Sequence, residues 1–319
     1  MPAVALRWKD LLSFHQRINL ITGKGGVGRT VVAVALAKSL ALAGRNVLLV
    51  ETGQPDEGFS PLGQYLGRAN LDDEPRNVGP HLDACQLWAN TGHELFARSV
   101  IPAGPLVTAA LRSKPLRRFM NAAPSFYELG ILYHFLHLVQ LEERGGGKRY
   151  DAVVVDMPAT GHTLALTSLP DVALRVVEKG PLASAMRRGQ GFIHDAKVTA
   201  AWVVTLPETL PVSEAIELVD GLRRTRVPVG GILLNRFLPD PFSEAEHRVV
   251  DRWMAAEPLR GRFALERIVM AGESVSRLTE STGLPVIRLH EVARDAGDAC
   301  AGLVAQFTDV NAVTGSSLG

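Results

Sequence analysis

A glycine-rich octapeptide near the start of the chain has the residue types and spacing of a site that holds phosphate. It consists of Gly23, Lys24, Gly25, Gly26, Val27, Gly28, Arg29 and Thr30. The pattern is G-x-x-x-x-G-K-[ST], with Arg29 in place of the lysine. Glycines let successive backbone N–H groups turn inward around an anion, and the N-terminus of a following helix adds its dipole. Thr30 would then offer its hydroxyl to Mg²⁺. The alternative is a glycine-rich turn without a ligand.

Arg29 keeps the positive charge of the lysine, but in a planar group that is larger and donates hydrogen bonds in a fork. We expect this change to weaken or abolish hydrolysis more than phosphate binding, because the backbone donors of the loop remain. The other hypothesis is that arginine replaces lysine without consequence.

A second block, from Val153 to Leu164, places an aspartate at the end of a short apolar run. Asp156 supplies the oxygen ligand that hard cations prefer, and since Mg²⁺ dehydrates reluctantly, the simplest contact is through a water molecule. We therefore expect Asp156 and Thr30 to form a metal site. Gly161, further along this block, permits close approach of the backbone to a terminal phosphate. For an isolated aspartate, a helix N-cap would be the ordinary role.

A third element is the apolar run from Gly231 to Leu234, which ends in Asn235. An asparagine amide has one acceptor and two donors, which match the N6 and N7 edge of adenine. Asn235 is therefore a candidate for recognising the base of an adenine nucleotide. The alternative is a turn residue whose side chain bonds its own backbone.

Short apolar runs that alternate with helical patterns would position these residues. Strands are predicted at 18–22, 46–50, 152–155, 201–205, 231–234 and 285–289, with a further strand indicated at 82–89. A helical pattern follows the octapeptide directly, so strand, loop and helix come in the order that a phosphate site requires. The alternation predicts an α/β fold with a mostly parallel sheet flanked by helices.

Residues from about 91 to 143 interrupt this alternation and are predicted to form a helical insertion within a single domain spanning 1–319. The last helix of this segment repeats apolar residues at helical spacing, namely Phe126, Leu129, Leu132, Tyr133, Leu136 and Val139. We expect this stripe to be buried against the sheet, and the alternative is an exposed groove for a partner's apolar helix. Residues 310–319 are expected to be a loose tail.

The composition limits the class of protein. The 319 residues are 46% hydrophobic and 21% charged, as in an ordinary globular protein. With 34 basic and 33 acidic side chains the net charge is +1, so we expect no nucleic-acid partner. The two cysteines, Cys85 and Cys300, are far apart in sequence, which favours a reducing, cytoplasmic location. No apolar stretch has the roughly 20 residues of a membrane span, so an integral membrane protein is not expected.

Two segments carry a resemblance to a known family. The loop, with its early Lys24, reads G-K-G-G-V-G-R-T, and the block from Asp156 reads D-M-P-A-T-G-H-T-L. The block is similar to the D-T-A-P-T-G-H-T-L segment of the arsenical-pump and tail-anchored-protein-targeting ATPases. These are P-loop NTPases with a deviant Walker A loop, and bacterial anion-transporting ATPases resemble them. The similarity covers nearly the full chain, with its most specific motifs at 23–30, 156–164, 230–235 and 284–292.

The resemblance implies an ATP-binding protein that uses Mg²⁺ and forms a homodimer, or a heterodimer with a paralogue. In this family the lysine that matches Lys24 reaches across the dimer to the phosphates of the other half, and the asparagine that matches Asn235 recognises the base. His162 would belong to a mobile switch. Lys24 and Arg29 would stabilise the charge of the transferring phosphoryl group.

One segment departs from the family pattern. Family members carry T-D-P-A-H after the second strand, where the aspartate orients the attacking water, whereas residues 51–57 read E-T-G-Q-P-D-E. Gly53 takes the place of the aspartate when Thr52 is aligned. Asp56 or Glu57 orients the water only if the loop is threaded differently. The Cys-x-x-Cys that binds zinc at the dimer seam of some members is absent.

The sequence thus predicts a dimeric switch ATPase, in which the nucleotide state at the dimer seam is coupled to the binding of a partner such as a protein client or a membrane protein. Arg29 and Gly53 favour the alternative of a hydrolysis-deficient nucleotide-binding subunit that pairs with an active paralogue. A third hypothesis, a membrane-protein chaperone, requires an exposed groove within 91–143.

Overall fold

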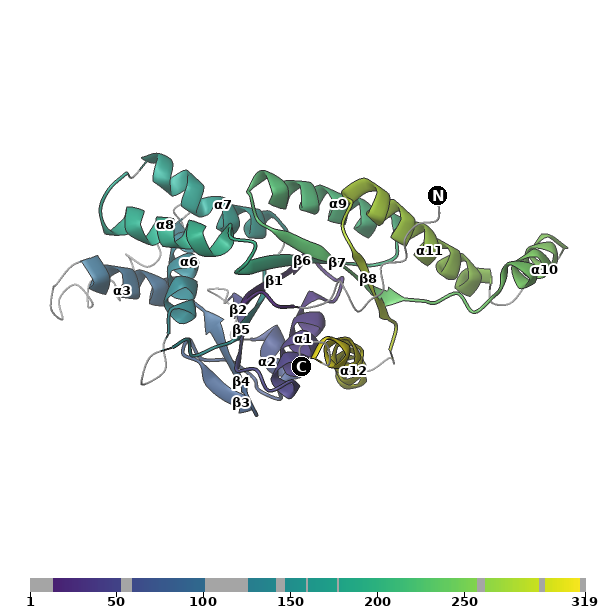
Figure 1. The fold of residues 1–319 in the computed structure, drawn as a ribbon, viewed down its shortest axis with the longest axis horizontal. Helices are drawn as coiled ribbons and strands as arrows, with labels where there is room; N and C mark the ends of the chain where they lie inside the picture. The colour runs from purple at the N-terminus through teal and green to yellow at the C-terminus, as the bar shows by residue number, and fades with distance from the viewer. Residues whose placement is uncertain are drawn as a thin grey trace.

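One sheet of eight strands forms the centre of the part of the chain that the structure describes. The computed structural model describes residues 14–52, 59–100, 126–141, 147–158, 160–176, 178–256, 262–292 and 296–315. The strands are β1 (Ile18–Gly23), β2 (Val47–Thr52), β3 (Arg76–Gly79), β4 (Leu82–Leu87), β5 (Ala152–Asp156), β6 (Thr199–Thr205), β7 (Val229–Phe237) and β8 (Val286–His290). Their order is β3-β4-β2-β5-β1-β6-β7-β8, and every neighbouring pair is parallel except β3 with β4 (Figure 1).

The predicted α/β fold with a mostly parallel sheet is confirmed. Each strand expected from the sequence lies in this sheet. The strands were predictable because runs such as 152–155 are buried on both faces of the sheet and are therefore continuously apolar. The sequence pattern did not indicate β3. It is a short edge strand of exposed and half-buried residues and therefore has no apolar run.

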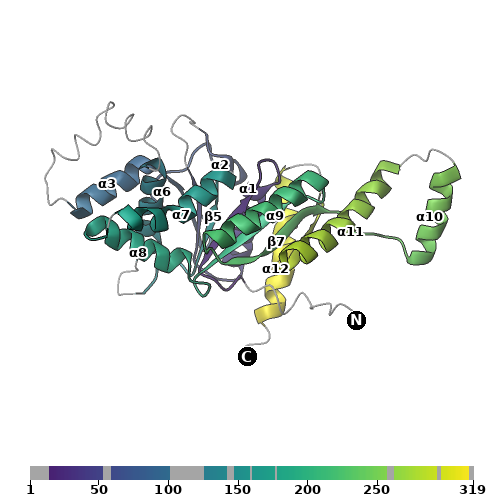
Figure 2. The ribbon, with the colours of Figure 1, turned by 90° about the horizontal axis from the view of Figure 1, so that it is seen from above.

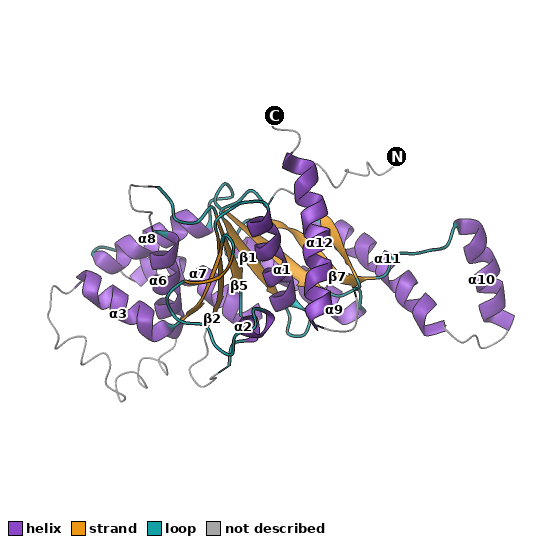
Figure 3. Cartoon of the chain, turned by 90° about the horizontal axis from the view of Figure 1, so that it is seen from below, coloured by secondary structure: helices purple, strands orange, loops and turns teal. Residues whose placement is uncertain are grey.

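Helices cover both faces of the sheet (Figures 1 and 3). One face carries α1 (Arg29–Leu42), α2 (Pro61–Tyr65) and α12 (Ala296–Gly315), and the other carries α7 (Thr160–Val176), α9 (Thr209–Arg224) and α11 (Arg262–Thr282). Successive residues of β2 point to opposite layers, as the pleat requires. Leu48 and Val50 pack in the core beneath α7 and α9, whereas Val47 and Leu49 pack in the core beneath α1 and α12.

The last helix extends further than the sequence indicated. α12 continues through Gly315, so residues 310–315, expected to begin a loose tail, are helical instead, and 316–319 lie outside the described residues. The helix packs along α1, and its Phe307 is buried with an edge-on contact to the ring of Phe14. This packing anchors α12 upstream of its final turns.

Three helices lie together at one end of the described structure (Figure 2), and one of them, α6, contacts β4. They are α3 (Ala89–Val100), α6 (Phe126–Val139) and α8 (Pro181–Ile193). In α6 the predicted stripe is largely buried, because Leu132, Leu136 and Val139 belong to the main core while Phe126 is 43% exposed. Residues 101–125 lie outside the described residues, so the extent of the predicted insertion stays a prediction.

α10 (Glu244–Ala256) and the start of α11 project beyond the β8 edge of the sheet in both views (Figures 1 and 2). This arm carries the exposed side chains of Val249, Trp253 and Phe263. Among the described residues, no helix is both long and apolar enough to cross a membrane.

Candidate functional site

The glycine-rich octapeptide joins β1 to α1 at the carboxyl edge of the sheet. Gly26 and Gly28 have φ values of +85° and +90°, in the left-handed region that glycine tolerates best. Gly28 is the N-cap of α1 and has no side chain to cap the helix. Lys24, Gly25 and Gly26 are exposed, while Val27 is buried in the core and anchors the loop. The loop thus presents a helix N-terminus at the surface, which is an arrangement suited to an anion.

Thr30 and Asp156 meet as the sequence predicts. The Thr30 hydroxyl donates to Asp156 Oδ2 at 2.6 Å, and parallel pairing places Asp156 beside Ile21 of β1. The second carboxylate oxygen, Asp156 Oδ1, is buried and has no hydrogen-bond partner among the described residues. Burial raises the pKa of Asp156 to about 6, although the Thr30 hydroxyl and the charge of Arg29 act in the opposite direction. A buried, unpartnered carboxylate oxygen beside a hydroxyl is a donor set that fits a hard cation.

Arg29 lies folded back over the end of β5. Its Nη1 donates to the carbonyl oxygen of Met157 at 2.7 Å, directly after Asp156. Two constraints therefore hold the guanidinium near the carboxylate: the backbone carbonyl that it bonds and the start of α1 that carries it. A lysine ammonium, a compact charge on a flexible stem, would not be held in the same way.

Lys24 forms an ion pair within its own chain. Its Nζ is 2.6 Å from Oε1 of Glu214, on α9, with Lys24 54% and Glu214 22% exposed. The lysine thus leans over the adjoining helix and remains accessible from outside.

Asn235, at the end of β7, lies against the octapeptide. Its Nδ2 donates to the carbonyl of Val27 at 2.9 Å, and its Oδ1 accepts from the backbone N–H of Arg236 at 3.0 Å. The side chain is buried, with 5% exposed. Recognition of a base by Asn235 stays a prediction; the contact with its own following backbone matches the alternative noted from the sequence.

Glu51 is a buried carboxylate at this edge that the motifs did not single out. It lies beside Asp156 in the pairing of β2 with β5, and it is 4% exposed. It accepts hydrogen bonds from the Ser60 hydroxyl, from the Leu62 N–H at 3.0 Å and from Gln86 Nε2 at 3.2 Å. Burial raises its pKa to about 7, against the effect of Ser60 and Leu62, and the charge of Asp156 raises it further. The sequence signal that could have identified Glu51 was a charged residue near the end of an apolar strand, as for Asp156.

The remaining predicted residues divide into described and undescribed ones. Gly161 is exposed in the first turn of α7, and His162 Nδ1 is 3.5 Å from Glu128 Oε1. Gly53 and Asp56 lie outside the described residues, so the water-orienting role of Asp56 stays a prediction. Within the described part of the chain, no cluster of three or more His, Cys, Asp or Glu could hold a metal ion.

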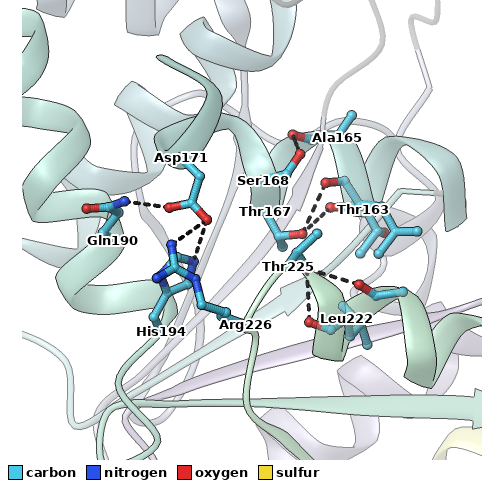
Figure 4. Close-up of polar contacts among 12 residues, drawn as sticks. Thr163, Ala165, Thr167, Ser168, Asp171, Gln190, His194, Leu222, Thr225 and Arg226 are labelled. Atoms are coloured by element: carbon cyan, nitrogen blue, oxygen red, sulfur yellow. Dashed lines mark hydrogen bonds and ion pairs between the residues drawn. The ribbon is translucent and has the colours of Figure 1, made fainter. Parts of the chain in front are cut away.

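α7 connects this edge to a second polar cluster. At its start, Thr163 Oγ1 accepts from Thr22 at 3.2 Å and donates to the Pro158 carbonyl at 2.8 Å. Further along, Asp171 accepts from Arg226 and Gln190 (Figure 4). Burial raises the pKa of Asp171, but these hydrogen bonds outweigh it and leave the pKa below its usual value. One helix therefore spans from the octapeptide's strand to the α7–α8–α9 junction.

Comparisons of the sequence with known proteins identify its family. A family model described as anion-transporting ATPase matches residues 16–185. ATPase BagA of Mycobacterium tuberculosis is 27% identical over 237 residues, which cover 73% of this chain and 68% of that protein. The arsenical pump-driving ATPase of Escherichia coli is 30% identical over 235 residues, 72% of this chain and 36% of that protein. ATPase GET3C of Arabidopsis thaliana is 25% identical over 286 residues, 76% of this chain and 72% of that protein.

The family match covers more than half of the 319 residues and includes the octapeptide, Glu51 and Asp156. It confirms the resemblance drawn from the loop and the D-M-P-A-T-G-H-T-L block. The chain belongs to the anion-transporting ATPase family.

Proposed function

We propose that this protein binds ATP with Mg²⁺ at the carboxyl edge of the sheet, hydrolyses it, and acts as a dimeric switch whose nucleotide state controls the binding of a partner. The observation that carries the proposal is the Thr30–Asp156 hydrogen bond of 2.6 Å beside the glycine-rich loop, with the second carboxylate oxygen unpartnered among the described residues. Family membership and relatives named ATPases support the same conclusion.

Thr30 and Asp156 would hold Mg²⁺, since both offer oxygen ligands and Asp156 ionises near neutral pH, its pKa being about 6. When bound, the ion neutralises charge on the phosphate oxygens. Because the Asp156 carboxylate is almost fully buried, little water solvates its charge, and its pKa is raised. A bound cation would stabilise the charged form and so lower this pKa.

The octapeptide would hold the phosphates. Gly26 and Gly28, with positive φ, turn the backbone so that N–H groups and the N-terminus of α1 face an anion. Arg29 and Lys24 add positive charge. In the nucleotide-free structure Arg29 contacts the Met157 carbonyl and Lys24 contacts Glu214. In the dimer Lys24 would leave Glu214 and reach the phosphates bound by a second copy or a paralogue.

Hydrolysis also needs an oriented water, and we propose Asp56 for that role. The relatives compared above are all named ATPases, which favours an active ATPase over a hydrolysis-deficient subunit. We also propose a partner, either a protein client or a membrane protein, and assign no surface of the chain to it.

Calorimetry with ATP in the presence and absence of Mg²⁺ tests the proposal. Asp156→Asn should abolish the Mg²⁺ dependence, whereas Asp220→Asn, at an exposed position of α9, should leave it unchanged. Nucleotide should also raise the melting temperature, because a ligand that binds only the folded state stabilises it. The absence of both heat and stabilisation at millimolar ATP would contradict nucleotide binding. Binding without turnover would instead support the hydrolysis-deficient alternative.

A further inference from the structure

α10 is a helix that local contacts hold in place at the end of the arm formed by α10 and the start of α11. In both views the arm projects beyond the β8 edge of the sheet, away from α1 (Figures 1 and 2). The N–H and the hydroxyl of Ser243 both donate to Glu246 Oε2 at 2.7 Å, which forms a capping box at the first turn. Asp240 Oδ2 lies 2.6 Å from His247 Nε2. None of the described side chains of α10 belongs to either hydrophobic core, so burial in this fold does not account for its apolar residues.

One side of α10 carries an exposed apolar stripe, formed by Val249 and Trp253. These residues are four positions apart and therefore lie one turn apart on the same side of the helix. Trp253 is 62% exposed, and Val249 is exposed as well. Phe263, in the first turn of α11, is 73% exposed and belongs to the same arm. Covering this stripe would remove apolar area from water, so the stripe favours contact with another apolar surface.

Two arginines border the stripe on one flank. Arg248 and Arg252 each precede a residue of the stripe, and both are exposed. Neither forms an ion pair with another described residue, and Arg252 Nε donates to the Arg248 carbonyl at 3.1 Å. Glu246 is engaged by the capping box, and by helical spacing the acidic positions 244 and 251 lie further round the helix from the stripe than the arginines do. The flank next to the stripe therefore presents positive charge.

An exposed tryptophan, an apolar stripe and bordering arginines are the features of a helix that lies in the plane of a lipid surface. A tryptophan ring suits the headgroup level, and arginine stems lie along apolar surface while the guanidinium groups reach lipid phosphates. A single projecting helix is convex and offers no groove to a partner's helix, which favours a flat surface over a protein segment. No described helix is long and apolar enough to cross a membrane, so the contact would be peripheral.

We propose that α10 docks the protein on the surface of a phospholipid bilayer that contains anionic lipids. Val249 and Trp253 enter the headgroup region, and Arg248 and Arg252 bind the lipid phosphates. This inference goes beyond the proposed function, because the arm lies away from the octapeptide and docking requires no nucleotide.

Flotation of the nucleotide-free protein tests the docking with two kinds of vesicle, phosphatidylcholine mixed with phosphatidylglycerol and phosphatidylcholine alone. We expect wild type to bind the mixed vesicles and Trp253→Ser to lower the partition coefficient about tenfold, because the ring no longer contributes apolar burial. The double variant Arg248→Gln with Arg252→Gln should lose about fivefold for each arginine on the mixed vesicles and change little on phosphatidylcholine alone. Leu210→Ser, at a 67% exposed apolar residue of α9, is the matched control and should bind as wild type does.

Tryptophan fluorescence provides a second readout that does not depend on a loss of binding. The mixed vesicles should shift the wild-type emission to shorter wavelength, and Trp253→Phe should still float with the vesicles but lose this shift. Wild type that floats with neither kind of vesicle, or Trp253→Ser that floats as well as wild type, would overturn the inference. Self-association without lipid that Trp253→Ser abolishes, with no flotation, would instead make the stripe an interface between copies. Protein that floats but fails to bind ATP would contradict only the proposed function.

Discussion

Arg29 places the positive charge of the loop in a defined position over the end of β5. One of its five N–H donors is used by the Met157 carbonyl, at 2.7 Å. A guanidinium held in this way is less free than a lysine ammonium to follow phosphates as charge develops on them. We therefore expect the residue that departs from the loop pattern to affect the rate of phosphoryl transfer more directly than nucleotide binding.

Restoring the family residues should show this. We expect wild-type turnover below roughly 1 per second, the low end for typical enzymes. Arg29→Lys or Gly53→Asp alone should help little, because one affects the phosphates and the other the attacking water. The double variant should gain more than the product of the single gains, as groups that act as a unit do. Single-turnover hydrolysis measures this. A fast wild-type rate that Asp56→Ala abolishes would show that Asp56 orients the water.

Glu51 should make the stability of the nucleotide-free protein depend on pH. Its pKa is raised from 4.5 to about 7 in the folded state, so between these values the folded protein binds more protons than the unfolded chain. The stabilisation is complete below pH 4.5 and is lost as pH rises through about 7. Denaturant unfolding should show that, relative to Glu51→Gln, the wild type loses on the order of 1–3 kcal/mol between pH 5 and pH 8.

Glu51→Gln provides the control for this loss, because it removes the titrating group and keeps the shape. The slope that remains in the variant comes from the other titrating groups, among them Asp156, whose pKa is raised to about 6, and His134, whose pKa burial lowers to about 4 and whose contribution has the opposite sign. Equal slopes for wild type and variant would show that Glu51 is ionised in both states throughout this range.

At the same scale, the sequence predicted Thr30 and Asp156 as a pair but gave no indication of the partners of Glu51. The first prediction needed only a loop and a strand end, both of which have local signals. The second depends on Ser60, Leu62 and Gln86, which reach Glu51 through the return of the chain into α2 and through β4. Hydrogen bonds of this kind follow from tertiary packing and have no spacing rule in the sequence.

At the scale of elements, α3 and α6 approach so closely that glycine is required between them. A Cβ on Gly92 would collide with the carbonyl oxygen of Gly130. Gly92→Ala should therefore lower the free energy of unfolding by on the order of 3 kcal/mol, since backbone would have to move. Gly191→Ala in α8, where a Cβ would meet nothing within 4 Å, is the matched control and should raise it by about 0.5–1 kcal/mol. Similar denaturation midpoints for the two variants would contradict this packing.

Elements were predictable to the extent that their residues are buried. β1, β2 and β5 are covered on both faces and read as apolar runs, whereas the edge strand β3 does not. The end of α12 was misjudged because its last residues, N-A-V-T-G, have weak helical propensity and follow a helix that packing on α1 stabilises. α7 was recognisable from its motif, but its contact with Arg226 through Asp171 (Figure 4) joins two segments that are distant in sequence.

At the scale of the whole molecule, the site faces outward at one edge of the sheet, where a second copy could approach it. Lys24 is half exposed and paired with Glu214, so a lysine that reaches a partner must first give up this ion pair. Exposed pairs contribute about 0.2–1 kcal/mol each, and a symmetric dimer would break two of them. In the proposed dimer the pair would therefore oppose dimerisation weakly, and the partner's bound phosphates would have to offer Lys24 a stronger interaction.

Removing the competing carboxylate should strengthen the nucleotide-bound dimer. We expect Glu214→Gln to lower its dissociation constant by roughly two- to thirtyfold, because two exposed ion pairs together amount to about 0.4–2 kcal/mol. Glu217→Gln, an exposed glutamate of the same helix, should have no effect, and Lys24→Ala should weaken the dimer. Sedimentation with a non-hydrolysed ATP analogue measures all four proteins. A Glu214→Gln dimer no tighter than wild type, with Lys24→Ala impaired, would show that Lys24 reaches the partner without leaving Glu214. A monomer at every concentration with nucleotide would contradict the homodimer itself.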